Sequence, residues 1–273
     1  MAELFSEQAA IYAAARPVYP KDLFAKLAAL TDGHRFAWDV GTGSGQAAIG
    51  VAEHYDKVLA TDASAEQLRH AVPHPKVRYL HTADTTPEEE LVAAVGGEGS
   101  VDLITVAQAV HWFDLPAFYA VANRVLRKPG GVIAVWGYNY HVIPVEDLLS
   151  RFFRTTLPYR DPRSWYLMEG FRNLPFPFAD VGLGREGQPA GFDIEQEKSF
   201  AGLIGMLRST GAVARARQQD GVELLDEHVI KELEEEWGGP ELVRKVTYKA
   251  FLLTGTPRPA PSPPPSAGAG LEE

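Results

Sequence analysis

A chain of 273 residues with 45% apolar and 23% charged side chains has the composition of a globular protein that can bury a sizeable core. Its formal net charge of −10, without a cluster of lysine and arginine, argues against a nucleic-acid partner held through its phosphates. The absence of cysteine excludes disulfides, thiolate nucleophiles and Cys-ligated metal sites.

The sequence predicts neither export nor insertion into a membrane. The amino end has acidic side chains where a secretion signal is basic, and no apolar run is long enough to span a bilayer. We therefore expect a cytoplasmic protein without a membrane partner. Residues 256–273 are mostly Pro, Ala, Gly and Ser with almost nothing to bury, which predicts a disordered tail.

Between residues 35 and 137 the pattern alternates between strand and helix. Short apolar runs predict five strands, at 35–40, 57–62, 76–82, 101–110 and 132–138. The helices between them carry start signals, which are a capping box at Ser64 and Gln67, the pair Thr86 and Pro87, and the cap Asp114. Strands joined by helical crossovers predict an α/β fold with a doubly wound parallel sheet.

Beyond Tyr138 this alternation ends. The remaining expected elements are helices at 145–157, 199–210 and 222–237 and strands at 192–200 and 243–255. The stretch 159–178 is aromatic and interrupted by proline, so we expect an irregular insertion there.

Three glycines, Gly41, Gly43 and Gly45, directly follow the first predicted strand, where an open parallel sheet binds its ligands. The third glycine comes one position too early for a dinucleotide fingerprint, and no Lys-Ser/Thr pair follows for a phosphate loop. Asp62 ends the second strand, where an acid can accept both hydroxyls of a ribose, and Asp84 follows the third strand equivalently. These features fit a ligand with an amino group and a ribose but no phosphate.

S-adenosylmethionine is such a ligand. The motifs "DVGTGSG", "TDAS", "TAD", "VDLITVAQAVHWFD" and "LRKPGGVIAVWGY" resemble the ordered motifs of class I S-adenosylmethionine-dependent methyltransferases. More narrowly, "LFSEQAAIYAAARPVYP" and "QAVHWFD" resemble the branch of trans-aconitate methyltransferase-like proteins and their plant relatives. The resemblance implies a Rossmann-like fold, mainly parallel and seven-stranded, with an inserted acceptor-binding cap.

The resemblance also implies how the chain is organised. One methyltransferase domain would cover residues 1–255, and its parts would be an N-terminal helical lid (1–34), a cofactor-binding half (35–137), an acceptor cap (138–215) and a closing helix and strand (216–255). A weak homodimer is a further expectation.

The resemblance assigns S-adenosylmethionine to the carboxyl edge of the sheet. Asp39 would steer the amino group of its methionine part, Asp62 would bind the ribose, and Asp84 would bind the adenine amino group. The expected cofactor contacts are Tyr12, Arg16, Tyr19, Asp39, Gly41, Thr42, Gly43, Gly45, Asp62, Ala63, Ala83, Asp84, Gln108 and Ala109. Simpler explanations stay open. The three glycines could serve only a tight turn, and Asp62 and Asp84 could each cap a helix.

His111 and Trp112 would face a small-molecule acceptor. Methyl transfer from a sulfonium requires alignment and a dry site rather than a metal. A carboxylate acceptor is already ionised at neutral pH and needs no base, whereas a phenol or an amine would need His111 as general base. His111 could also be a hydrogen-bonded packing residue without a chemical role.

The acceptor is expected to meet an apolar wall. The aromatic residues proposed for it are Phe152, Phe153, Trp165, Tyr166, Phe171, Phe176 and Phe178, each of which could instead belong to the core. The related proteins carry a run similar to "RSWSAY", and this chain has "RSTGAV" at 208–213 in its place. If these residues line the acceptor pocket, the pocket is expected to be larger and less polar than in the relatives. Alternatives are a nicotinamide-dependent reductase, which lacks its glycine spacing here, and a non-catalytic S-adenosylmethionine-binding protein.

Overall fold

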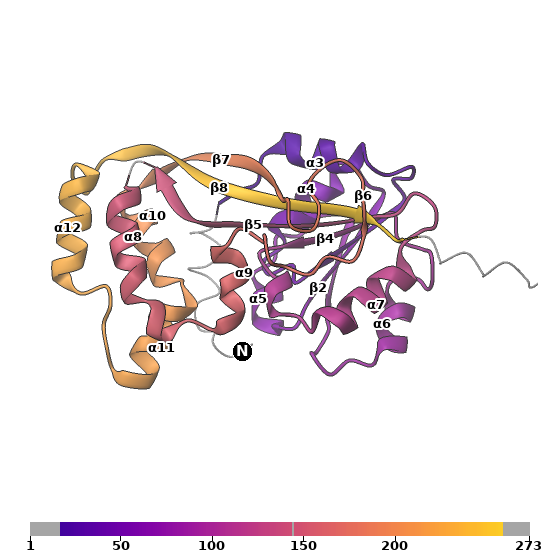
Figure 1. The fold of residues 1–273 in the computed structure, drawn as a ribbon, viewed down its shortest axis with the longest axis horizontal. Coiled ribbons are helices and arrows are strands. Elements are labelled where there is room, and N and C mark those ends of the chain that lie inside the picture. Colours follow the sequence, from indigo (N-terminus) through magenta and orange to yellow (C-terminus); the bar gives the residue numbers. More distant parts are fainter. Residues whose placement is uncertain (1–16, 144, 259–273) are drawn as a thin grey trace, which may run out of the picture.

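The computed structural model describes residues 17–143 and 145–258 (Figure 1). Two expected cofactor contacts, Tyr12 and Arg16, lie outside the described residues, as does the chain from residue 259 onward. No helix in the described ranges is long and apolar enough to cross a membrane.

A single mixed sheet forms the centre of the molecule and confirms the α/β, mainly parallel, doubly wound fold. Its order is β3-β2-β1-β4-β5-β8-β6, with β7 also paired to β8. The first five strands of this order are parallel, and β8 runs antiparallel to β5, β6 and β7. The strands are β1 (Phe36–Val40), β2 (Lys57–Asp62), β3 (Val77–His81), β4 (Leu103–Ala107), β5 (Val132–Ile143), β6 (Ala179–Asp180), β7 (Ala190–Ser199) and β8 (Val243–Thr256). The described sheet has eight strands where seven were expected, because the two residues of β6 pair with the end of β8.

Helices cover both faces of the sheet. Side chains alternate along β1, so that Ala37 faces a core shared with α3 and α4, whereas Trp38 faces a core shared with α6 and α7. The α-helices are α3 (Lys21–Ala28), α4 (Gln46–Ala52), α5 (Ala65–Arg69), α6 (Glu88–Ala94), α7 (Leu115–Val125), α8 (Glu146–Thr155), α9 (Trp165–Met168), α10 (Phe200–Arg208), α11 (Gly211–Asp220) and α12 (Glu227–Trp237). Three 3-10 turns are η1 (Val110–Trp112), η2 (Leu157–Tyr159) and η3 (Pro162–Ser164).

Two of the expected helix caps are confirmed. The Ser64 hydroxyl accepts a hydrogen bond from the Gln67 amide, and the Asp114 carboxylate accepts one from Ala117. The helix start expected at Thr86 and Pro87 is confirmed as well, because α6 begins at Glu88; it has no side-chain cap, and three glutamates lie in its first turn.

Two expectations for the carboxyl-terminal half are corrected. The helix expected at 222–237 begins only at Glu227, where Asp226 accepts from the Val229 amide, so its first five residues precede it. The helix α11 was not expected, because "GAVARARQQD" has no regular apolar stripe; its buried face consists of small side chains and Val213.

The three strands β5, β7 and β8 continue from the parallel part of the sheet into a helical lobe (Figure 1). In Figure 1 the helices α8, α10, α11 and α12 gather at that end, beyond the parallel part of the sheet. Leu149 of α8, Leu207 of α10 and Trp237 of α12 are buried in the same core cluster as Ala37 of β1. The lobe therefore shares one continuous core with one face of the sheet.

Candidate active site

Two adjoining cavities lie at the carboxyl edge of the parallel strands. The larger has a volume of about 590 Å³ and is lined by the loops after β1, β2, β3 and β4. The smaller has a volume of about 90 Å³ and lies against the helical lobe. Gln108, Trp112 and Tyr138 line both cavities. Ligands in the two cavities would therefore meet at these three residues.

The glycine loop forms one wall of the larger cavity. Gly41, Gly43 and Gly45 all have positive φ, at 66°, 58° and 87°. A Cβ at Gly41 would lie 2.6 Å from that of Ala109, and a Cβ at Gly45 would overlap the Tyr79 hydroxyl. A Cβ at Gly43 would meet only Gln67 Oε1, at 3.9 Å. Gly41 and Gly45 are thus required by the protein's own packing, and Gly43 leaves room on the cavity side.

Asp39 lies behind this loop and is almost completely buried. The hydroxyls of Thr42 and Thr105 donate to its two carboxylate oxygens at 2.5 and 2.6 Å. Burial raises the pKa of Asp39 to about 6, with the negative charge of Asp62 adding to the shift. No Lys, Arg or His pairs with it in the part of the chain that the structure describes. The site therefore holds uncompensated negative charge, which fits a ligand with an ammonium group.

This raised pKa gives a testable pH dependence. The folded protein keeps a proton on Asp39 up to about pH 6, whereas the unfolded chain releases it near pH 4. We expect the free energy of unfolding of the cofactor-free protein to fall by about 3 kcal/mol from this group as the pH rises through that range. Urea unfolding of wild type and Asp39→Asn between pH 4 and 8 measures it. If the free energies of unfolding of the two proteins changed with pH in the same way, the raised pKa of Asp39 would be contradicted.

Asp62 ends β2 with both carboxylate oxygens oriented by backbone. Oδ2 accepts from the Gly43 amide at 2.7 Å and Oδ1 from the Ser64 amide at 2.8 Å. Desolvation raises its pKa, while these two hydrogen bonds oppose the shift. The carboxylate lines the larger cavity beside Ala83 and Asp84. Its position suits acceptance of two neighbouring hydroxyl groups.

Most of the expected cofactor contacts come together around the larger cavity. Those that line it are Tyr19, Gly41, Thr42, Gly43, Asp62, Ala63, Ala83, Asp84, Gln108 and Ala109. Asp39 and Gly45 stand behind this lining. Ser44, Gln67 and Arg163 also line the cavity and were not expected.

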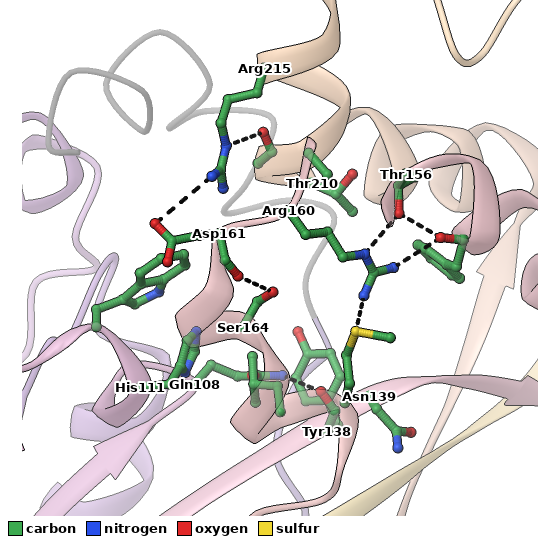
Figure 2. Close-up of a pocket in the computed structure, with 16 residues that line it drawn as sticks. Gln108, His111, Tyr138, Asn139, Thr156, Arg160, Asp161, Ser164, Thr210 and Arg215 are labelled. Atoms are coloured by element: carbon green, nitrogen blue, oxygen red, sulfur yellow. Dashed lines mark hydrogen bonds and ion pairs between the residues drawn. The ribbon is translucent and has the colours of Figure 1, made fainter. Parts of the chain in front are cut away.

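The strand expected at 101–110 is shorter in the structure, where β4 ends at Ala107. The chain therefore turns at Gln108, where the two cavities adjoin. Gln108 takes a left-handed conformation with φ 58°, and its side-chain amide donates to the Tyr138 carbonyl at 2.9 Å (Figure 2). The following turn η1 carries His111 and Trp112, both of which line the smaller cavity. His111 is 3% exposed. The two expected catalytic residues therefore lie together at this cavity.

The expected apolar wall is wrong. Of its seven aromatic residues, Phe153 alone lines the smaller cavity. Phe171, Phe176 and Phe178 belong to the core on one face of the sheet, and the Trp165 side chain is half exposed. Other apolar side chains, among them Leu167 and Met168, line the cavity together with charged ones, and Figure 2 labels the charged residues Arg160, Asp161 and Arg215.

Three charged side chains, those of Arg160, Asp161 and Arg215, line the smaller cavity. Arg160 donates to the Thr156 hydroxyl at 2.8 Å, and its guanidinium lies 5.4 Å from the centre of the Phe153 ring. Arg215 donates to the Gly211 carbonyl at 3.3 Å and lies 3.9 Å from the carboxylate of Asp161. Two arginines and one aspartate therefore line the cavity, and the guanidinium N–H groups could donate hydrogen bonds to a small anion.

Part of the segment 208–213 also reaches this cavity. Thr210, Gly211 and Ala212 line it, whereas Val213 is buried in the core. The small side chains leave room there, but the neighbouring arginines make the cavity more polar than expected. The described residues contain no group of three or more His, Asp or Glu that could hold a metal ion.

Comparisons with known proteins agree with this geometry. A family model described as "Methyltransferase domain" matches residues 38–135. A solved structure from Anaeromyxobacter dehalogenans, described as a "Putative Type II Methyltransferase", is 32% identical with a TM-score of 0.75, and the match covers 90% of this chain and 99% of that one.

Curated relatives match over shorter stretches. A "Putative methyltransferase" of Dictyostelium discoideum is 39% identical over 125 residues, which cover 45% of this chain and 44% of the relative. An "Uncharacterized methyltransferase" of Mycobacterium bovis is 32% identical over 181 residues, which cover 65% of this chain and 66% of the relative. The chain therefore aligns with less than half of the Dictyostelium protein's length.

Proposed function

The chain belongs to the class I S-adenosylmethionine-dependent methyltransferases, and from this membership we propose that it transfers a methyl group from S-adenosylmethionine to a carboxylate oxygen of a small-molecule acceptor. The two guanidinium groups that line the smaller cavity, those of Arg160 and Arg215, carry the choice of acceptor. A volume of about 90 Å³ suits a small molecule. A carboxylate has two charged oxygens, so it can accept charge-assisted hydrogen bonds from both guanidinium groups, whereas a phenol has one oxygen and a protonated amine has no acceptor.

The larger cavity has the chemistry that this cofactor requires. S-adenosylmethionine supplies an electrophilic methyl group on a sulfonium sulfur. Asp39 places negative charge beneath the glycine loop for the ammonium group, and Asp62 offers acceptors for the ribose hydroxyls. Gln108 lies between the two cavities, held by the Tyr138 carbonyl, so it would separate the sulfonium side from the acceptor side.

The acceptor side supplies orientation rather than proton transfer. Arg160 and Arg215 would hold the carboxylate so that one oxygen points at the methyl carbon. In that step the oxygen forms a bond to carbon, the carbon–sulfur bond breaks, and its electron pair stays on sulfur. No proton moves. His111 would orient the acceptor by a hydrogen bond, and the burial of the pocket would limit water.

The role of His111 tests the carboxylate assignment. We expect His111→Gln, which keeps a hydrogen-bond donor, to retain kcat/KM within about tenfold, because a carboxylate needs no base. A phenol or amine acceptor would instead lose its proton acceptor, and turnover would fall by roughly 10²–10⁴. The measurement is the pH profile of kcat/KM for both proteins, with an acceptor found by screening small acids, phenols and amines. The carboxylate assignment would be overturned if His111→Gln lost kcat/KM by this larger factor and the kcat/KM of wild type changed with pH near neutrality.

A further inference from the structure

Arg163 lies on the turn η3, between the two cavities. Resting on the proposed function, we propose that Arg163 is a cofactor-binding residue supplied by the cap, whose guanidinium covers the adenosine end of S-adenosylmethionine. The residue comes from the proline-interrupted insertion and not from any loop of the parallel sheet. It lines the larger cavity all the same.

The position of the guanidinium is well defined. Its Cζ lies 5.2 Å from the centre of the Trp112 ring, and Nη1 donates to the Trp112 carbonyl at 3.2 Å. Trp112 lines both cavities, so Arg163 packs on the residue that separates them. The Arg163 side chain is 45% exposed, which leaves surface for a ligand to cover.

Asp161 fixes the guanidinium in this position. Nε and Nη2 of Arg163 donate to the two oxygens of the Asp161 carboxylate, each at 3.0 Å, in a bidentate pair. The Arg163 amide donates to Oδ1 of the same carboxylate at 3.0 Å. Such a pair limits the rotamers of a long side chain before any ligand binds, which lowers the entropic cost of binding. Asp161 is therefore a positioning residue for Arg163.

The adenosine end is the part of the cofactor that this guanidinium can reach. Arg163 lines the cavity together with Ala83 and Asp84 after β3, and the charge of Asp84 acts on it. The methionine end would lie instead near Asp39 of β1 and Gly41 of the loop that follows it. A planar guanidinium stacks well on an aromatic face, and the purine ring would offer such a face beside Trp112.

Calorimetric titration with S-adenosylhomocysteine and with 5′-methylthioadenosine, which lacks the amino-acid part, tests the proposal. We expect Arg163→Gln to weaken binding of both ligands by the same factor, roughly five- to thirtyfold. Arg163→Lys should lie between this variant and wild type, because it keeps the charge and loses the planar fork. Asp161→Asn should weaken the binding of both ligands when Arg163 is present, and it should have no further effect in the Arg163→Gln variant.

Arg185→Gln is the matched control. Arg185 is also surface-exposed and paired with an aspartate, Asp180, at 3.6 Å, but it lines neither cavity, so its replacement should leave both affinities unchanged. Unchanged affinities in folded Arg163→Gln would overturn the proposal and leave the proposed function standing. A loss confined to S-adenosylhomocysteine would overturn the adenosine assignment. Failure of wild type to bind either ligand would overturn the proposed function itself.

Discussion

Replacement of Asp62 by alanine is expected to weaken the binding of S-adenosylhomocysteine by about 2–4 kcal/mol, roughly 30- to 1000-fold. The carboxylate is oriented toward the cavity by the Gly43 and Ser64 amides, so a ribose would find two acceptors already in place. Its removal leaves the ligand hydroxyls without a charged acceptor in a poorly solvated site. Isothermal calorimetry measures the change directly.

Asp226→Ala is the control for this experiment. Asp226 also accepts a hydrogen bond from a backbone amide, at the start of α12, but it lines neither cavity. Its loss should cost about 1 kcal/mol of stability and no ligand affinity. A folded Asp62→Ala protein with wild-type affinity would show that the carboxylate does not contact the ligand.

Replacement of Asp102 by alanine is expected to destabilise the fold by about 3–5 kcal/mol. Asp102 is fully buried where β4 begins, and it accepts from the amides of Arg35 and Phe36 and from Arg127 Nε, at 2.9, 3.0 and 2.5 Å. Without it, two backbone donors and a partly buried guanidinium lose their acceptor between β1 and β4. Urea unfolding at neutral pH measures the loss.

A surface ion pair gives the comparison. Glu98 pairs with Arg124 at 2.9 Å, but the Glu98 side chain is 69% exposed, so Glu98→Ala should change the free energy of unfolding by less than about 1 kcal/mol. Equal effects of the two substitutions would mean that Asp102 contributes no more than an exposed charge.

The lining of the larger cavity was predictable because its signals are local. The glycine loop follows β1, Asp62 ends β2 and Asp84 comes shortly after β3, and parallel strands bring their carboxyl ends to one edge. The caps Ser64 and Asp114 likewise act within three residues. Such features depend on short-range geometry, which a sequence pattern records.

The acceptor side was not predictable in the same way. Arg160 and Arg215 stand on different segments, and their meeting at one cavity depends on the packing of α11 against η2. Phe171 and Phe176 are equally apolar whether they line a pocket or fill a core, so composition could not separate the two. The strand β4 ends early because Gln108 has a positive φ, and the sequence gives no sign of this because the residue is not a glycine.

The long strands that carry the helical lobe have a mechanical consequence. β8 is hydrogen-bonded to β5 on one side and to β7 on the other, from the parallel sheet into the lobe, with a register irregularity only between Tyr138 and Val142 on β5. A three-stranded ribbon resists bending far more than a single connecting peptide, so α8 and α10 cannot swing away as a rigid flap on a hinge. The turns of residues 157–168 are not part of this ribbon, so a change in their conformation would not require the strands to bend.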